Sequence, residues 1–136
     1  MEKYFLDEDI VLVCIKADTF PEGVLAAHQK LHKIIPRIEG RMYYGISRPE
    51  ENGEIVYKAA AEEMEPGEAA KSGLETFILE TGTYISILIA GYLEDISSIG
   101  KAFQQLIHLP EIDPEGYCVE MFVNDDDVRC MVRLKS

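Results

Sequence analysis

The segment IVLVCIKADTFPEG, residues 10–23, joins an apolar run to a helix start. The six apolar residues 10–15 are rich in β-branched side chains and too few for a packed helix, which predicts a buried strand. Thr19 and Glu22 have the spacing of a capping box, and Pro21 suits a first helical turn. We therefore expect a helix to begin here, with one face made of Val24, Ala27, His28, Leu31, Ile34 and Ile35.

Two strands follow this helix in the predicted order. Residues 42–46 and 54–63 have β-forming composition, and the segment 49–53 between them is rich in turn-forming residues. The first part of the chain therefore has the pattern strand, helix, strand, strand.

A related pattern occurs again in the second part of the chain. Residues 74–79 and 83–91 predict strands, and a helical apolar spacing up to Ile107 follows Asp95, a plausible N-cap. Residues 117–123 and 128–134 then predict a closing hairpin. The segment 64–73, with turn formers at both ends, is expected to be a crossover loop. These patterns predict one α+β domain over 1–136, with pseudo-symmetric half-repeats at about 10–63 and 74–134.

Composition limits the classes of function. The chain has 136 residues, 47% of them hydrophobic, and a net charge of −12, which disfavours nucleic-acid and anionic membrane partners and favours organic cations. It contains no apolar run near the length of a membrane span, and its acidic start lacks the basic residues of a secretory signal. We therefore expect a cytoplasmic protein.

Motifs for metal or cofactor chemistry are scarce in this sequence. Cys14, Cys118 and Cys130 stand singly inside predicted strands, which predicts free buried thiols, and His28 and His32 lack the pattern of a zinc helix. We expect no cofactor and no metal. Because catalytic groups assemble in space, a carboxylate facing an aromatic cleft remains a possible general base, and enzymatic activity stays an open question.

Alternation along the predicted strands assigns side chains to faces. In residues 83–91, three isoleucines share the face expected to carry the helices, and Tyr84 and Ser86 face a cleft or solvent. In residues 117–123, Glu120 shares a face with Cys118 and Phe122. A carboxylate flanked by apolar residues reaches solvent, pairs with an internal cation or awaits a ligand.

Several short motifs occur together in a recognisable order. They are Tyr44-Gly45-Ile46, Ile55-Val56-Tyr57, the segment 81–84 leading to Ala90-Gly91, and the strand with Glu120. With these motifs the chain resembles, over about 10–134, the GyrI-like small-molecule-binding domains built from SHS2 modules. These domains are the effector-binding domains of AraC-type and MerR-type transcription regulators.

This resemblance implies a duplicated β-α-β-β fold with an antiparallel sheet, two helices on one face and a central cleft. It implies that the cleft binds a small cationic or planar aromatic molecule, as in multidrug-binding regulators. Glu120 would pair with the positive charge of the ligand. Tyr44, Tyr57 and Tyr84 would form the walls, with Phe122 as an addition. No DNA-binding helix-turn-helix precedes residue 10, so we expect a stand-alone effector-binding protein linked to transcription regulation or to drug and toxin sensing. Tryptophan, frequent near the second helix of relatives, is absent, and Phe103 occupies that stretch.

Three functions remain open at this point. The first is a ligand-binding module. The second is a small hydrolase of reactive cyclopropane-type compounds that uses Glu120 as general base, with Tyr84 or Tyr57 orienting water. The third is a protein-interaction role of the gyrase-inhibitor type, with an unknown partner that recognises the acidic surface.

Overall fold

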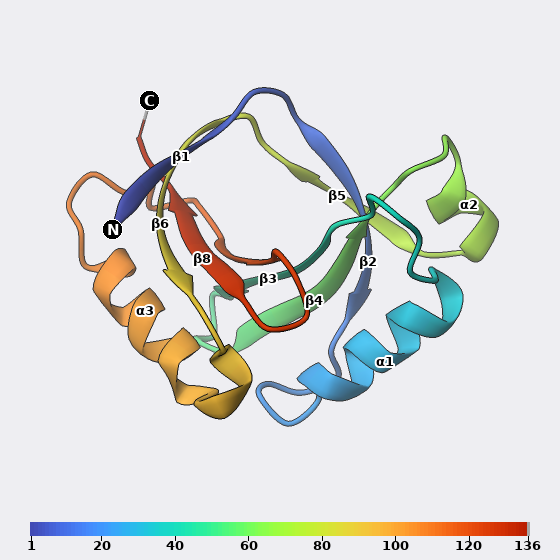
Figure 1. Ribbon diagram of the computed structural model, residues 1–136, viewed down its shortest axis with the longest axis horizontal. Coiled ribbons are helices and arrows are strands. Elements are labelled where there is room, and N and C mark those ends of the chain that lie inside the picture. The colour runs from blue at the N-terminus through green and yellow to red at the C-terminus, as the bar shows by residue number, and fades with distance from the viewer. Residues whose placement is uncertain (136) are drawn as a thin grey trace.

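The protein is described here by a computed structural model of residues 1–135 (Figure 1). It contains an eight-stranded antiparallel sheet, the helices α1, Val24–Ile34, and α3, Ser97–Ile107, and the short helix α2, Glu68–Ser72. The predicted α+β class is confirmed. The strands are β1, Glu2–Leu6; β2, Ile10–Lys16; β3, Tyr43–Pro49; β4, Ile55–Glu62; β5, Glu75–Leu79; β6, Gly82–Ile89; β7, Cys118–Phe122; and β8, Val128–Arg133.

The strand order in the sheet is symmetric about its centre. The order is β1-β6-β8-β7-β3-β4-β2-β5, and exchanging β1 to β4 with β5 to β8 reproduces it in reverse. The central pair is β7 with β3, where Tyr44 lies opposite Met121. Each half therefore contributes two strands, a helix and two strands, joined at the seam between β3 and β7.

The edge strands are exchanged between the halves. Strand β1 of the first half pairs with β6 of the second, and β5 of the second half pairs with β2 of the first. The links β1–β2 and β5–β6 therefore both cross between the halves (Figure 1). Thr81 connects these links, because its Oγ1 donates to the Leu6 carbonyl at 2.6 Å and its amide donates to Asp9 at 2.7 Å.

One face of the sheet carries the helices α1 and α3. Ala27 and Leu31 of α1 pack on β2, β3 and β4, and Ala102 and Leu106 of α3 pack on β6 and β8. The face predicted for the helices is confirmed in β6, where the contacts with the α3 cluster come from Ile85, Ile87 and Ile89.

The opposite face of the sheet is also buried. Leu12, Tyr44, Met121 and Met131 lie in its core, each at most 3% exposed. The rings of Phe77 in β5 and Tyr117 next to β7 lie 4.9 Å apart, although three strands separate β5 from β7 in the sheet. The sheet therefore curls until its edge strand β5 approaches its centre.

The structure differs from the sequence-based expectations in three places. Strand β1 was not predicted, because five residues with only Tyr4 and Leu6 turned inward give a weak signal. The expected loop at 64–73 contains α2, which lies between Gly67 and Gly73, both at positive φ. The helices begin later than expected: α1 starts at Val24 and has no side-chain cap, and α3 starts at Ser97 with Ile96 as N-cap.

The three cysteines are free, with Cys14 and Cys130 buried. Burial raises the pKa of each thiol, to about 12 for Cys14. Within residues 1–135, no helix has both the length and the apolar character that crossing a membrane requires.

Candidate ligand-binding site

Glu120 lies at the middle of the sheet, on the helix-bearing face. In the strand register it is opposite Gly45 of β3 and Cys130 of β8. Gly45 leaves the space that Glu120 needs, because a Cβ at position 45 would overlap both the Tyr57 hydroxyl and the Glu120 carboxylate. A larger residue at position 45 is therefore incompatible with this arrangement.

A chain of hydrogen bonds connects α1, β4 and β7. The Tyr57 hydroxyl donates to Glu120 Oε1 at 2.7 Å, and His28 Nε2 lies 2.8 Å from the same hydroxyl oxygen. Because a phenol has a single proton, which here points to Glu120, we assign the hydrogen of the neutral His28 ring to Nε2. His28 therefore donates to the Tyr57 hydroxyl, and this hydroxyl donates to Glu120.

The charge of Glu120 has no cationic partner. Among residues 1–135, no Lys, Arg or His nitrogen lies within 4.0 Å of its carboxylate, and Tyr57 supplies its one protein hydrogen bond. Burial raises the pKa of Glu120, and the hydrogen bond from Tyr57 offsets part of this rise. Burial also lowers the pKa of His28 to about 4, so His28 is neutral at physiological pH. Of the three alternatives for Glu120, pairing with an internal cation is therefore excluded.

Five aromatic rings from both halves of the chain form one connected set around Tyr57, the residue that donates to this carboxylate, and we call them the aromatic cage. The Phe20 ring stacks on Tyr57 with centroids 5.9 Å apart, and His28 meets Phe122 edge-on at 5.4 Å. The ring centroids of Tyr92 and Phe122 lie 5.9 Å apart. Burial raises the pKa of Tyr92, and the negative charge of Glu120 raises it further. The cage consists of Phe20, His28, Tyr57, Tyr92 and Phe122.

The structure divides the five residues that the sequence suggested for ligand binding. Glu120, Tyr57 and Phe122 lie together on the helix-bearing face. Tyr44 and Tyr84 lie on the opposite face, where both are 2% exposed. Because Tyr44 directly precedes Gly45 in β3, strand alternation turns it away from Glu120.

Sequence reasoning missed three members of the cage. His28 belongs to the predicted apolar face of α1, but the sequence offered no motif that gives it a role beyond that face. In the structure His32 stacks instead on Tyr43, with ring centroids 4.2 Å apart. Phe20 and Tyr92 lie outside strands and α-helices, where periodicity gives no signal.

Comparison with known proteins supports the fold alone. No protein-family model and no curated protein sequence matches the chain. An integron cassette protein from the mobile metagenome of Vibrio cholerae has a similar structure, with a TM-score of 0.69, 8% identity and coverage of 98% of this chain and 95% of that one. The protein SAV2435, solved bound to tetraphenylphosphonium, has a TM-score of 0.66 at 14% identity, with 97% and 93% coverage. A hydrolase from Listeria innocua has a TM-score of 0.56 at 12% identity, with 98% and 90% coverage. These likenesses are compatible with a GyrI-like fold.

Gly45→Ala is expected to destabilise the protein by about 1–3 kcal/mol, because the added methyl group overpacks the Tyr57–Glu120 contact. Urea unfolding followed by circular dichroism measures the change. Gly100→Ala is the matched control: a Cβ at Gly100 of α3 meets only open space, so alanine there is expected to stabilise by roughly 0.5–1 kcal/mol. Equal stability of Gly45→Ala and wild type would contradict the close approach.

The depressed pKa of His28 predicts a loss of stability in acid. Between pH 6.5 and about 4 the unfolded chain binds a proton at this histidine and the folded chain does not, so the free energy of unfolding falls as the pH falls. The loss is on the order of 3 kcal/mol. The raised pKa of Glu120 has the opposite effect on stability. The protonated carboxyl group stabilises the folded state at low pH, and this stabilisation is lost as the pH rises above 4.5.

His28→Gln isolates the histidine contribution from that of the carboxylates. Its free energy of unfolding, measured with urea at a series of pH values, is expected to fall less steeply than that of wild type over this range. Identical slopes for the two proteins would show that His28 is not buried in its neutral form.

Proposed function

We propose that this chain forms an effector-binding domain of the GyrI-like type, which binds a small organic cation with planar aromatic groups. The observation that carries the proposal is the Glu120 carboxylate, which accepts a hydrogen bond from Tyr57 of the aromatic cage and has no cation within 4.0 Å among residues 1–135. In this proposal the bound cation supplies the missing charge. The role that follows is sensing of a drug or toxin, linked to transcription regulation.

The chemistry of the cage suits a cation with low hydration. Aromatic faces attract cations through their quadrupole, by about 0.5–2 kcal/mol for each close contact. A carboxylate in a partly desolvated site attracts the same charge more strongly than one in water. Binding of a cation would also oppose the effect of burial on Glu120, because a nearby positive charge favours the ionised carboxylate. The rings and the carboxylate therefore favour the same ligand class.

The likeness to SAV2435 supports this ligand class. That protein was solved with tetraphenylphosphonium, a cation surrounded by aromatic rings, and its fold covers 97% of this chain. We propose by analogy that tetraphenylphosphonium is a usable probe for this protein. The argument for the position of the site rests on the residues of this chain, since the two sequences share only 14% identity.

Glu120→Gln is expected to weaken tetraphenylphosphonium binding by about tenfold to a hundredfold, because glutamine keeps the acceptor for Tyr57 and removes the charge. Isothermal titration calorimetry measures the affinity, and tetraphenylborate, which has a similar shape and the opposite charge, tests the sign preference. The exposed Glu51→Gln makes the same change of charge elsewhere and should bind like wild type. The melting temperature of Glu120→Gln should equal or exceed that of wild type, because the variant removes an unpaired charge whose pKa is raised by burial. An unchanged affinity in this variant would remove the proposed site.

Hydrolysis of a reactive electrophile is the second candidate function. The chain His28–Tyr57–Glu120 favours it, because a carboxylate of raised pKa beside a hydroxyl and a neutral imidazole can accept and pass a proton. Glu120 would act as general base on a water molecule, and Tyr57 would orient that water or the substrate. The similar fold of the hydrolase from Listeria innocua supports testing this activity.

An electrophilic cyclopropane compound distinguishes the two functions. If the protein is a hydrolase, ring-opened product forms with wild type and its rate falls by about 100-fold or more in Glu120→Gln. Chromatography of the reaction mixture follows the product. Tyr57→Phe, which removes only the hydroxyl, should reduce turnover as well. Product formation at equal rates in wild type and Glu120→Gln would leave Glu120 without a catalytic role.

A further inference from the structure

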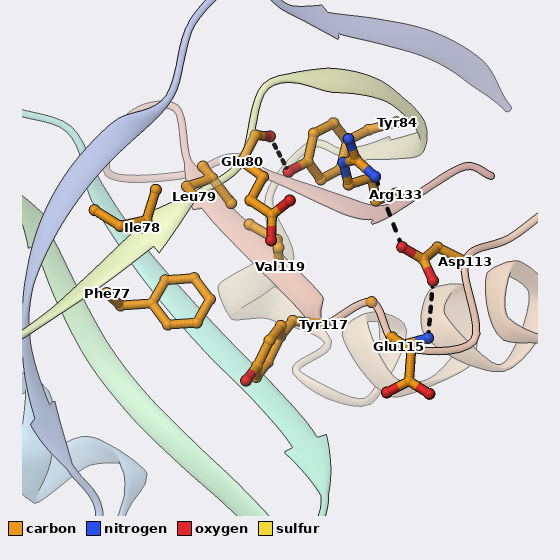
Figure 2. A pocket seen from close by; sticks show the side chains of 11 residues that line it. Phe77, Ile78, Leu79, Glu80, Tyr84, Asp113, Glu115, Tyr117, Val119 and Arg133 are labelled. Carbon is orange, nitrogen blue, oxygen red and sulfur yellow. Dashed lines mark hydrogen bonds and ion pairs between the residues drawn. The ribbon is translucent and has the colours of Figure 1, made fainter. Parts of the chain in front are cut away.

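A cavity of about 240 Å³ lies on the face of the sheet opposite the aromatic cage (Figure 2). Its inner wall includes Leu79, Tyr84 and Val119, which belong to the buried core of that face. The curl of the sheet creates this space, because it brings the edge strand β5 over the segment that leads into β7. None of the cage residues lines it.

Two aromatic rings form one side of the cavity. Phe77 and Tyr117 meet edge to face, with centroids 4.9 Å apart and planes at 84°. The Arg48 guanidinium lies 4.8 Å from the centroid of the Tyr117 ring and donates to the Glu115 carbonyl at 3.2 Å. These contacts hold Tyr117 in place, so this wall is formed before a ligand arrives.

The positive group that lines the cavity is already engaged. Arg133 donates through Nε and Nη2 to the Thr81 carbonyl, at 3.2 and 2.8 Å, and its Nη1 lies 3.6 Å from Asp113. The Tyr84 hydroxyl is also engaged, since it donates to the Glu80 carbonyl at 2.6 Å. Both groups therefore already have partners within the protein.

Two carboxylates at the cavity have no partner in the described part of the chain. The side chains of Glu80 and Glu115 make no hydrogen bond or ion pair within residues 1–135. Figure 2 shows the Glu80 carboxylate directed into the space above the Tyr117 ring. Of the four charged side chains that line the cavity, three are acidic, so the site favours a cation.

We propose that this cavity binds a small primary amine that carries one aromatic ring. Its ammonium group lies at Glu80, with Glu115 nearby, and its ring packs on Phe77 and Tyr117. The cavity is smaller than the roughly 300–1,000 Å³ of sites for drug-sized ligands, so it suits a single ring better than a large polycyclic cation. The protein then has two cation sites of different size on opposite faces of one sheet, and this second site does not depend on the aromatic cage.

The probe is 2-phenylethylamine, with the uncharged 2-phenylethanol as its matched analogue. Titration of the ¹⁵N-labelled protein is expected to shift the amide signals of residues 77–80 and 115–117 in a saturable manner. The alcohol should bind about tenfold more weakly or worse, because it lacks the charge that Glu80 attracts. Equal binding of amine and alcohol, or shifts confined to the aromatic cage, would overturn the proposal.

Variants separate this site from the proposed function. Glu80 is exposed, so Glu80→Gln should fold like wild type and bind the amine about tenfold more weakly, whereas the control Glu51→Gln should bind it unchanged. Phe77→Leu should also weaken binding, since it removes the aromatic wall. Glu120→Gln should leave the amine-induced shifts of residues 77–80 and 115–117 unchanged, so failure of the Glu120 site and failure of this one give different results. If neither Glu80→Gln nor Phe77→Leu alters amine affinity, the cavity is not the binding site.

Discussion

The hydrogen bond from Tyr57 to Glu120 is the interaction on which the candidate site depends. It holds a carboxylate on the helix-bearing face of the sheet, where burial raises its pKa and no protein cation lies within 4.0 Å among residues 1–135. The pair requires glycine at position 45, and it requires α1 to place His28 on the other side of the Tyr57 hydroxyl. Leaving a half-buried carboxylate without a cation costs part of its hydration, and a bound cation would offset that cost, which is the physical argument for a ligand.

The exchange of edge strands gives this small domain two different faces. Because β1 pairs with β6 and β5 pairs with β2, the links between these strands cross from one half to the other and favour a curled sheet. The helices occupy one face and leave the Glu120 pair beside the seam between the halves. The curl shapes the opposite face into a core with a cavity at one end. A flat sheet of the same strands would not bring Phe77 to Tyr117.

Much of the fold could be predicted from the sequence, because it is recorded in local patterns. Strand alternation placed Ile85 on the helix side of β6 and placed Glu120 on one face with Cys118 and Phe122. The assignment of faces between strands could not be predicted, because it depends on register. Tyr44 and Tyr57 both lie in strands, and only the pairing of Gly45 with Glu120 shows that Tyr57 shares the carboxylate's face and Tyr44 does not. Phe20 and Tyr92 enter the cage from irregular segments, whose positions are set by tertiary packing.

The central claim is that Glu120 and the aromatic cage form the binding site for an organic cation. A crystal structure of the protein grown with tetraphenylphosphonium tests it most directly. The claim predicts the cation on the helix-bearing face, with a ring of the cage within about 6 Å of it and the Glu120 carboxylate turned toward the phosphorus. Tetraphenylphosphonium bound away from Glu120, with no contact to His28, Tyr57 or Glu120, would contradict it.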